Sequence, residues 1–237
     1  DLKRTAQRSL TSSGAYSDRA FGETGAPTVP PLWVLQMLNN VVISHLATAH
    51  GFRGPNAVFS PFEDAGVDAL DQGILAIQEG DAQVAIVGAS SFPISMPQHA
   101  RFSAAGHLAD SDAPDAEGLV LGEGAAVLVL ESEAHARARG ARIFAEIVSP
   151  ATPTLNDVDR VYVSGGYRPR DFAQHPNVVA SREGMGDLLA AAVTTDVVLA
   201  TLALERGAPG PQVCAVRSLE GRSSAVRVNP HRPHEAA

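Results

Sequence analysis

Residues 118–141 read GLVLGEGAAVLVLESEAHARARGA, and this stretch decides the fold class. Its glycine-containing start is typical of a turn, and the apolar run at 125–130 predicts a β-strand. The charged segment at 133–139 predicts a short helix with a solvated face. A strand followed closely by a helix is the repeating pattern of a layered α/β protein, so we expect that fold class.

A strand, a helix and a second strand are predicted upstream of this stretch. Residues 57–60 predict a short strand, residues 64–79 a helix, and the β-branched run at 84–88 a buried strand. The apolar residues of the helix fall on one face, at Val67, Leu70, Ile74 and Ile77. This order predicts a βαβ unit, in which the two strands pair in parallel through a right-handed crossover.

The remaining segments continue the alternation of strands and helices. Further strands are predicted at 143–148, 158–163, 213–216 and 225–228, and further helices at 2–10, 32–49 and 187–205. Prolines near residue 150 mark a boundary, so we expect two halves, residues 1–149 and residues 150–237.

The composition is that of a globular chain, with 45% hydrophobic and 19% charged residues among 237. The 18 basic and 26 acidic residues give a net charge of −8, which argues against a nucleic-acid binder. A lone cysteine, Cys214, excludes an intramolecular disulfide framework, and we expect a buried, unreactive thiol. No apolar run is long enough to span a membrane, and the histidines match no zinc spacing. We therefore expect a cytoplasmic protein without a metal site.

The stretch 118–141 closely resembles the signature of the β-ketoacyl synthase family, which reads GFVLGEGAAVLVLE followed by HAxARGA. Weaker resemblance extends from about residue 30 to about residue 228 and includes the motifs around residues 54–56, 77–82 and 185–192. The first thirty residues match poorly. The resemblance implies a thiolase-like layered α/β fold with halves related by a pseudo-twofold axis, here truncated in both halves.

The resemblance also locates the positions where the family carries its catalytic groups. Glu63 falls where the family has its nucleophilic cysteine, Ser164 and Asp187 fall at its two histidines, and Arg182 falls at its lysine. The family's Gly-Phe-Gly-Gly turn, which supplies an oxyanion-hole N–H, is replaced by residues 218–222, SLEGR. Glutamate cannot form an acyl thioester, so no catalytic residue for condensation is expected. Three replacements would bring negative charge or bulk to an acyl pocket: Glu63, Asp187 and Glu220.

These losses together resemble the chain-length factor, the ketosynthase-like subunit of type II polyketide synthases that lacks the catalytic cysteine. The resemblance implies a heterodimer with a catalytic ketosynthase, contact with an acyl carrier protein through that complex, and no cofactor. Short partners of this kind resemble those of polyene-forming, highly reducing systems. We expect the strand at 57–60 to pair across the dimer, and the tunnel and interface candidates are Trp33, Leu35, Met37, Leu38, Phe59 and Glu63.

Other interpretations remain open at this point. Glu63 and Asp187 could form an acid–base pair in an independent acyl-thioester decarboxylase or hydrolase, with one pKa raised by burial. A structural homodimer is a third hypothesis. The tunnel candidates could be ordinary core residues, and Glu63 could be a relic position that tolerates a helix-capping residue.

Overall fold

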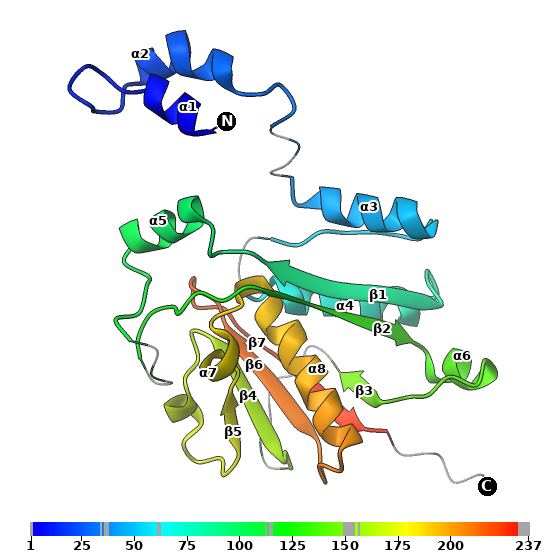
Figure 1. Cartoon of the computed structure of the whole chain (residues 1–237). Coiled ribbons are helices and arrows are strands. Elements are labelled where there is room, and N and C mark those ends of the chain that lie inside the picture. Colours follow the sequence, from blue (N-terminus) through cyan, green and yellow to red (C-terminus); the bar gives the residue numbers. More distant parts are fainter. Residues whose placement is uncertain are drawn as a thin grey trace, which may run out of the picture. The chain divides into compact units, whose positions relative to one another are not determined.

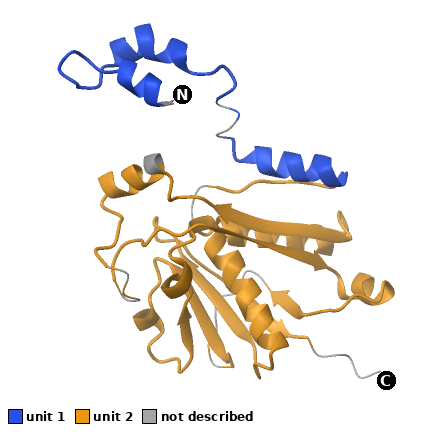
Figure 2. Cartoon of the chain, viewed as in Figure 1, with its two compact units in different colours: residues 1–53 blue, residues 54–237 orange. Residues whose placement is uncertain are grey.

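The computed structural model describes residues 2–33, 35, 38–60, 63–111, 113, 116–148, 155 and 157–231. The chain divides into two compact units, residues 1–53 and residues 54–237 (Figure 2). The candidate site residues Glu63, Ser164, Arg182 and Asp187 all lie in the second unit, whereas Trp33, Leu35 and Leu38 lie in the first.

The first unit consists of short helical segments. Inside it, the buried Ser9 hydroxyl donates a hydrogen bond to the Thr5 carbonyl at 2.7 Å. The predicted helix at 32–49 begins only at Asn40, because the backbone around Trp33 forms turns whose hydrogen bonds span three residues. The helical segments are α1 (Leu2–Arg8), α2 (Asp18–Ala20), η1 (Phe21–Gly25), η2 (Ala26–Thr28) and α3 (Asn40–His50).

The second unit is a layered α/β structure in which two helices lie between two sheets (Figure 1). The central helices are α4 (Ala65–Gln78) and α8 (Ala192–Glu205). One sheet pairs β1 (Val84–Ser91) with β2 (Gly124–Glu131) in antiparallel register. The other sheet has the order β3 (Ala145–Val148), β7 (Ser223–Pro230), β6 (Gln212–Arg217), β4 (Arg160–Gly165), β5 (Val178–Ala180). In it β4 is parallel to β5 and β6, and β7 is antiparallel to β6 and β3.

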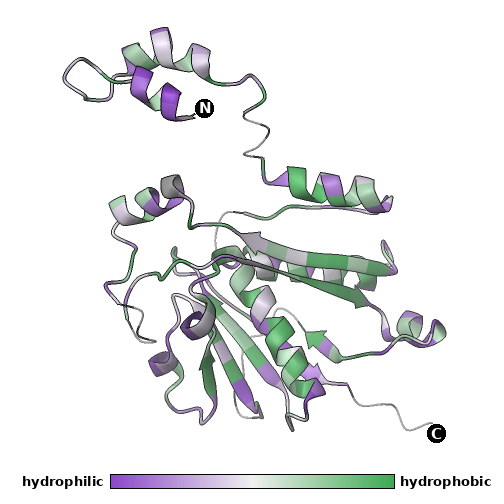
Figure 3. Cartoon of the chain, viewed as in Figure 1, coloured by the Kyte–Doolittle hydropathy of each residue, from purple (hydrophilic) through white to green (hydrophobic). Residues whose placement is uncertain are grey.

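One hydrophobic core joins the layers. It contains Val67 and Leu70 from α4, Val87 from β1 and Val193 and Val197 from α8, together with residues of β4, β6 and β7. Figure 3 shows β1, β2 and much of α8 as predominantly hydrophobic. Only one face of β1 and β2 faces the core, since Val127 and Val129 on β2 are each 59% exposed. The expectation of a buried cysteine is confirmed, because Cys214 belongs to this core.

Glycines allow α4 to approach both neighbouring layers. A Cβ at Gly73 would lie 2.3 Å from Cγ2 of Val87, and a Cβ at Gly66 would lie 2.7 Å from the Ala190 carbonyl oxygen. The second contact brings the start of α4 next to the chain that leads into α8, and both segments carry candidate site residues.

The predicted βαβ unit is wrong. Residues 57–60 have no regular structure, and β1 pairs antiparallel with β2 instead of parallel with that segment. Val58 is 43% exposed. A strand requires a neighbouring strand, and residues 57–60 belong to neither sheet in the described part of the chain.

The predicted helix at 187–205 is partly wrong as well. Asp187 instead forms a β-bridge: its N–H donates to the Val120 carbonyl and its carbonyl accepts from the Gly122 N–H. The helix α8 therefore starts at Ala192, after the short turn η5 (Leu189–Ala191). Four further elements were not predicted as such: α5 (Met96–Ala104), η4 (Pro169–Phe172), β5, and α7 (Arg182–Met185). The charged helix predicted at 133–139 is confirmed as α6 (Glu133–Ala138).

Candidate functional site

Glu63 is a buried carboxylate immediately before α4, and it is only 1% exposed. Its Oε2 accepts a hydrogen bond from the backbone N–H of Leu219 at 2.9 Å. Its Oε1 has no hydrogen-bond partner among the residues that the structure describes. The side chain therefore joins the start of the central helix α4 to the turn between β6 and β7. Glu63 and Leu219 are 156 residues apart along the chain.

The turn after β6 is held in place by its own hydrogen bonds and by α4. The Ser218 N–H donates to the Arg222 carbonyl at 2.9 Å, and the Arg222 N–H donates to the Ser218 hydroxyl at 3.2 Å. The Arg222 guanidinium reaches Asp64 at 2.7 Å and Asp68 at 3.2 Å, both at the start of α4. These contacts fix the Leu219 N–H against Glu63. Glu220 is exposed, so it does not contribute the buried negative charge expected from the sequence.

Burial raises the pKa of Glu63 above its ordinary value, because the ionised form loses its hydration. The Leu219 N–H opposes this shift by stabilising the carboxylate, whereas the nearby charges of Asp64 and Asp187 add to it. The charge of Asp187 is the smallest of these contributions to the raised pKa of Glu63.

Asp187 is buried, and it is held by backbone and by an arginine. Its Oδ2 accepts a hydrogen bond from the Val120 N–H at 2.7 Å and lies 3.7 Å from Nη2 of Arg182. Burial raises the pKa of Asp187, while the Val120 N–H and the charges of Arg182 and Arg168 lower it. The two residues at the positions of the family's second histidine and its lysine thus form a buried ion pair.

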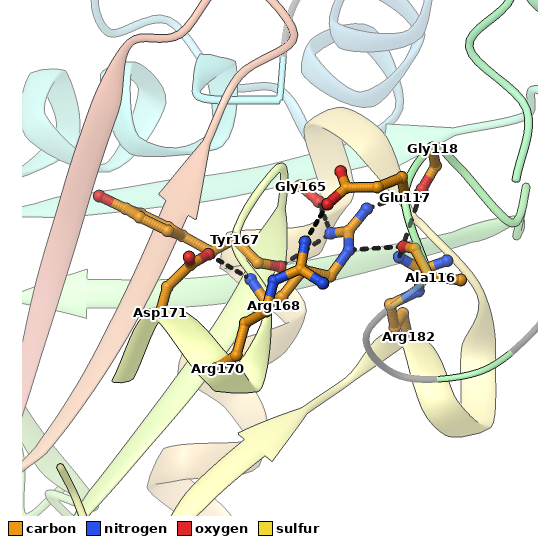
Figure 4. Close-up of polar contacts among 9 residues, drawn as sticks. All are labelled: Ala116, Glu117, Gly118, Gly165, Tyr167, Arg168, Arg170, Asp171 and Arg182. Carbon is orange, nitrogen blue, oxygen red and sulfur yellow. Dashed lines mark hydrogen bonds and ion pairs between the residues drawn. The ribbon is translucent and has the colours of Figure 1, made fainter. Parts of the chain in front are cut away.

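Arg168 and Arg182 together bind one loop through its carbonyl oxygens (Figure 4). Arg168 donates to the carbonyls of Ala116 at 2.9 Å and Gly118 at 2.7 Å, and Arg182 donates to the same two at 3.2 and 3.3 Å. Arg168 donates two further bonds to the carbonyls of Gly165 and Tyr167 at 2.7 and 2.8 Å. Its guanidinium thus ties the end of β4 to the segment that leads toward β2.

The two guanidinium groups differ in their charged partners: Arg182 pairs with Asp187, whereas the bonds described for the Arg168 guanidinium all go to backbone carbonyls. Both arginines are buried, and the pKa of Arg168 is lowered by burial first and by the charge of Arg182 second. At the rim, Arg170 forms an ion pair with Glu117, and the Arg168 N–H donates to Asp171 at 2.8 Å. The carbonyl dipoles are therefore the main groups that stabilise the buried Arg168.

Ser164 lies at the end of β4 beside a buried acid on α8. It is 5% exposed, and its hydroxyl lies 3.5 Å from the Ala215 carbonyl oxygen. Burial raises the pKa of Asp196 to about 7, and the hydroxyls of Ser181 and Ser164 lower it. Neither carboxyl oxygen of Asp196 has a hydrogen-bond partner of good geometry among the described residues.

The sequence interpretation missed Asp196 and Arg168. Asp196 had a signal, because it is the one acidic residue within the apolar run at 192–204. Arg168 had none, since its partners at Ala116 and Gly118 are about fifty residues away along the chain. Among the described residues, no group of three histidines, cysteines or carboxylates could hold a metal ion.

The structure places the tunnel and interface candidates in different parts of the chain. Trp33 is partly buried, whereas Leu35 is 50% and Leu38 is 43% exposed. Phe59 is partly buried in the irregular segment before Glu63. Met37 lies outside the described residues. No helix in the described part of the chain is long and apolar enough to cross a membrane.

Removal of the Glu63 side chain tests its hydrogen bond to Leu219. We expect Glu63→Ala to lower the free energy of unfolding by about 1–3 kcal/mol, because the partly buried Leu219 N–H is left without its acceptor. Glu63→Gln keeps an acceptor and removes the buried charge, so at pH 8 it should be at least as stable as the wild type. Urea unfolding measures both. Equal losses in the two variants would contradict the assigned bond.

Two kinds of comparison connect this chain with known sequences. The model of the β-ketoacyl synthase N-terminal domain matches residues 9–136, which is 128 of 237 residues. This match includes most of the first thirty residues, where the motifs alone had found little resemblance. The 3-oxoacyl-[acyl-carrier-protein] synthase 2 of Vibrio cholerae is 35% identical over 143 residues, and that of Staphylococcus aureus is 32% identical over 139. Each alignment covers 55% of this chain and 34% of the relative, so the match spans about a third of the relatives' length.

Solved structures confirm the expected thiolase-like layered α/β fold. A type II polyketide synthase ketosynthase, solved in complex with its acyl-carrier protein, matches with a TM-score of 0.70 and 21% identity. The match covers 90% of this chain and 69% of that chain. A β-ketoacyl synthase from Burkholderia phymatum matches with a TM-score of 0.72 and 19% identity, over 90% of this chain and 72% of that one. With the family model matching more than half of the sequence, the chain belongs to the β-ketoacyl synthase family.

Proposed function

We propose that this chain is a non-catalytic, chain-length-factor-like subunit of a type II polyketide synthase. It pairs with a catalytic ketosynthase, stabilises it and helps to shape its acyl tunnel. In this proposal Glu63 stands at the nucleophile position, Ser164 and Asp187 at the histidine positions and Arg182 at the lysine position. The acyl carrier protein meets the pair through the catalytic subunit.

The observation that carries the proposal is the bond between Glu63 and the Leu219 N–H. An acyl-transfer site needs a free nucleophile and a free N–H donor for the developing oxyanion. Here the Glu63 carboxylate stands at the nucleophile position. It accepts a hydrogen bond from the Leu219 N–H, which belongs to the turn that replaces the family's oxyanion-hole turn. The neighbouring groups are a serine, a buried ion pair and a buried acid, so no thiol or imidazole is available at these positions.

The irregular segment at 57–60 supports pairing with another chain. Residues 57–59 lie outside both sheets in the described part of the chain, and Val58 is 43% exposed. Such a segment gains hydrogen bonds when a strand of a partner lies beside it. We place the contact with the catalytic ketosynthase here, and we keep the division into family halves at residues 1–149 and 150–237 as part of the proposal.

Trp33 tests the proposed role in the tunnel. In a reconstituted complex of this chain, the catalytic ketosynthase and acyl carrier protein, we expect Trp33→Ala to lengthen the product, because a large side chain no longer limits the tunnel. Trp33→Phe, which keeps an aromatic ring, serves as the control and should change product length little. Mass spectrometry of the released chains measures both. Unchanged length in Trp33→Ala, with the complex intact, would make Trp33 an ordinary packing residue.

A second candidate function is supported by the electrostatic coupling of Glu63 and Asp187. Burial raises the pKa of both, and two acids with shifted pKa values can act as an acid–base pair. Such a chain would decarboxylate or hydrolyse an acyl thioester by itself. Incubation of the isolated chain with malonyl and acyl thioesters of acyl carrier protein separates the two functions. The subunit proposal predicts no turnover, whereas turnover that is lost in Glu63→Gln would establish the enzyme.

A further inference from the structure

A groove on the second unit is separate from the site described above. It has a volume of about 490 Å³ and lies between the C-terminal half of α8 and the strands β4 and β5. Arg160 and Tyr162 line it from β4, Leu199 and Leu202 line it from α8, and Arg206 lies where the helix ends. A volume of this size suits a small ligand.

The two arginines of this groove have no carboxylate partner in the part of the chain that the structure describes. Among the described residues, Arg160 makes a long contact of 3.5 Å from Nη1 to the hydroxyl of Tyr162. Unlike them, many other arginines pair with an acid, and these include Arg137, Arg142 and Arg227. Two unpaired cations in one groove are notable in a chain whose net charge is −8.

The rest of the groove is mostly apolar, and a buried polar side chain that does not line it lies behind Arg160 in the sheet. Val179, Leu199, Leu202 and Ala203 form its aliphatic wall. Gln212 is fully buried, and neither its amide oxygen nor its amide nitrogen has a partner among the described residues. Gln212 is the register partner of Arg160, so its side chain leaves the sheet on the same face.

We propose that this groove binds a small amphipathic anion, an aliphatic chain that carries a carboxylate or phosphate head group. Guanidinium groups bind the oxygens of carboxylates and phosphates through charge-assisted hydrogen bonds. Arg160 and Arg206 supply two guanidinium groups in this groove. The aliphatic part lies along Leu199 and Leu202. Arg206 also neutralises the negative end of α8, and the test below separates that role from ligand binding. The inference does not depend on the proposed function.

Calorimetric titration of the full chain tests the groove with five probes: octanoate, octyl phosphate, 1-octanol, acetate and inorganic phosphate. We expect both octyl anions to bind and the neutral alcohol and the short anions to bind at least tenfold more weakly, because head and tail both contribute. The octyl anion that binds with the higher affinity, octanoate or octyl phosphate, identifies the preferred head group. Added salt should weaken the binding of both.

Variants locate the binding in the groove. Arg160→Gln and Arg206→Gln should each weaken binding of the octyl anions about tenfold, and Leu202→Glu should remove it. Arg137→Gln, an exposed arginine on α6 paired with Glu133, is the matched control and should bind like the wild type. Circular dichroism verifies that each variant is folded. Equal affinity for 1-octanol and octanoate, or unchanged affinity in both groove arginine variants, would overturn the proposal.

Discussion

Asp196→Asn is expected to stabilise the chain strongly above pH 7 and to leave it unchanged near pH 4. The pKa of this fully buried carboxyl is about 7 in the folded chain, against an ordinary value of 3.8. Below 3.8 both the folded and the unfolded states bind the proton. Between 3.8 and about 7 only the folded state binds it, so stability falls as pH rises through this window. Above 7 the full cost of the buried charge remains.

The size of this effect follows from the shift in pKa. A change of about three units corresponds to a cost on the order of 4 kcal/mol above pH 7. Because Glu63 and Asp187 also have raised pKa values, the measured quantity is the difference between Asp196→Asn and the wild type at each pH. Urea unfolding from pH 4 to pH 8 gives this difference. A difference that does not grow with pH would show that Asp196 does not remain protonated in the folded chain.

Arg168→Met is expected to lower the free energy of unfolding by about 3 kcal/mol. Arg168 donates to four carbonyl oxygens, and the carbonyls of Gly165 and Tyr167 lose their bond to its guanidinium when it is removed. Unpaired buried polar groups each cost about 1–3 kcal/mol, while relief of the repulsion with Arg182 offsets part of this.

Two controls separate geometry from charge in this prediction. Arg168→Lys keeps the charge, but its ammonium cannot reach all four acceptors, so we expect a loss close to that of Arg168→Met. Arg170→Met removes a neighbouring exposed arginine paired with Glu117 and should cost less than about 1 kcal/mol. Guanidinium chloride unfolding compares the three variants. Similar losses for Arg168→Met and Arg170→Met would contradict the anchoring role of Arg168.

The elements that the sequence predicted well are those set by local patterns. The strands at 84–88 and 125–130, the apolar face of α4 and the burial of Cys214 are confirmed, because strand and helix periodicity determines which residues face a core. The predicted burial of 84–88 is wrong, because only Val87 is buried and Val84 and Ile86, on the other face of the strand, are 42% and 48% exposed. The segment at 57–60 looked like a strand for the same local reason. It failed because a strand also requires a neighbour, which short-range patterns do not reveal.

The candidate site depends on contacts between distant residues, and the sequence predicted it only in part. The family motifs located Glu63, Ser164, Arg182 and Asp187, all of which are buried. They did not reveal that Glu63 binds the Leu219 N–H, 156 residues away. Asp187 was assigned to a helix, since its bridge to Leu121 is also a long-range contact. Contacts of this kind follow from the packing of the layers.

The most direct test of the subunit proposal is the native mass of this chain after co-expression with a catalytic ketosynthase of a type II polyketide synthase from the same organism. The account predicts a one-to-one complex in which this chain is more stable than it is alone, because exposed apolar residues such as Val58 gain a partner. A well-folded chain that stays separate from the ketosynthase would contradict the account, and Glu63 and Asp187 would then be assayed as an active site.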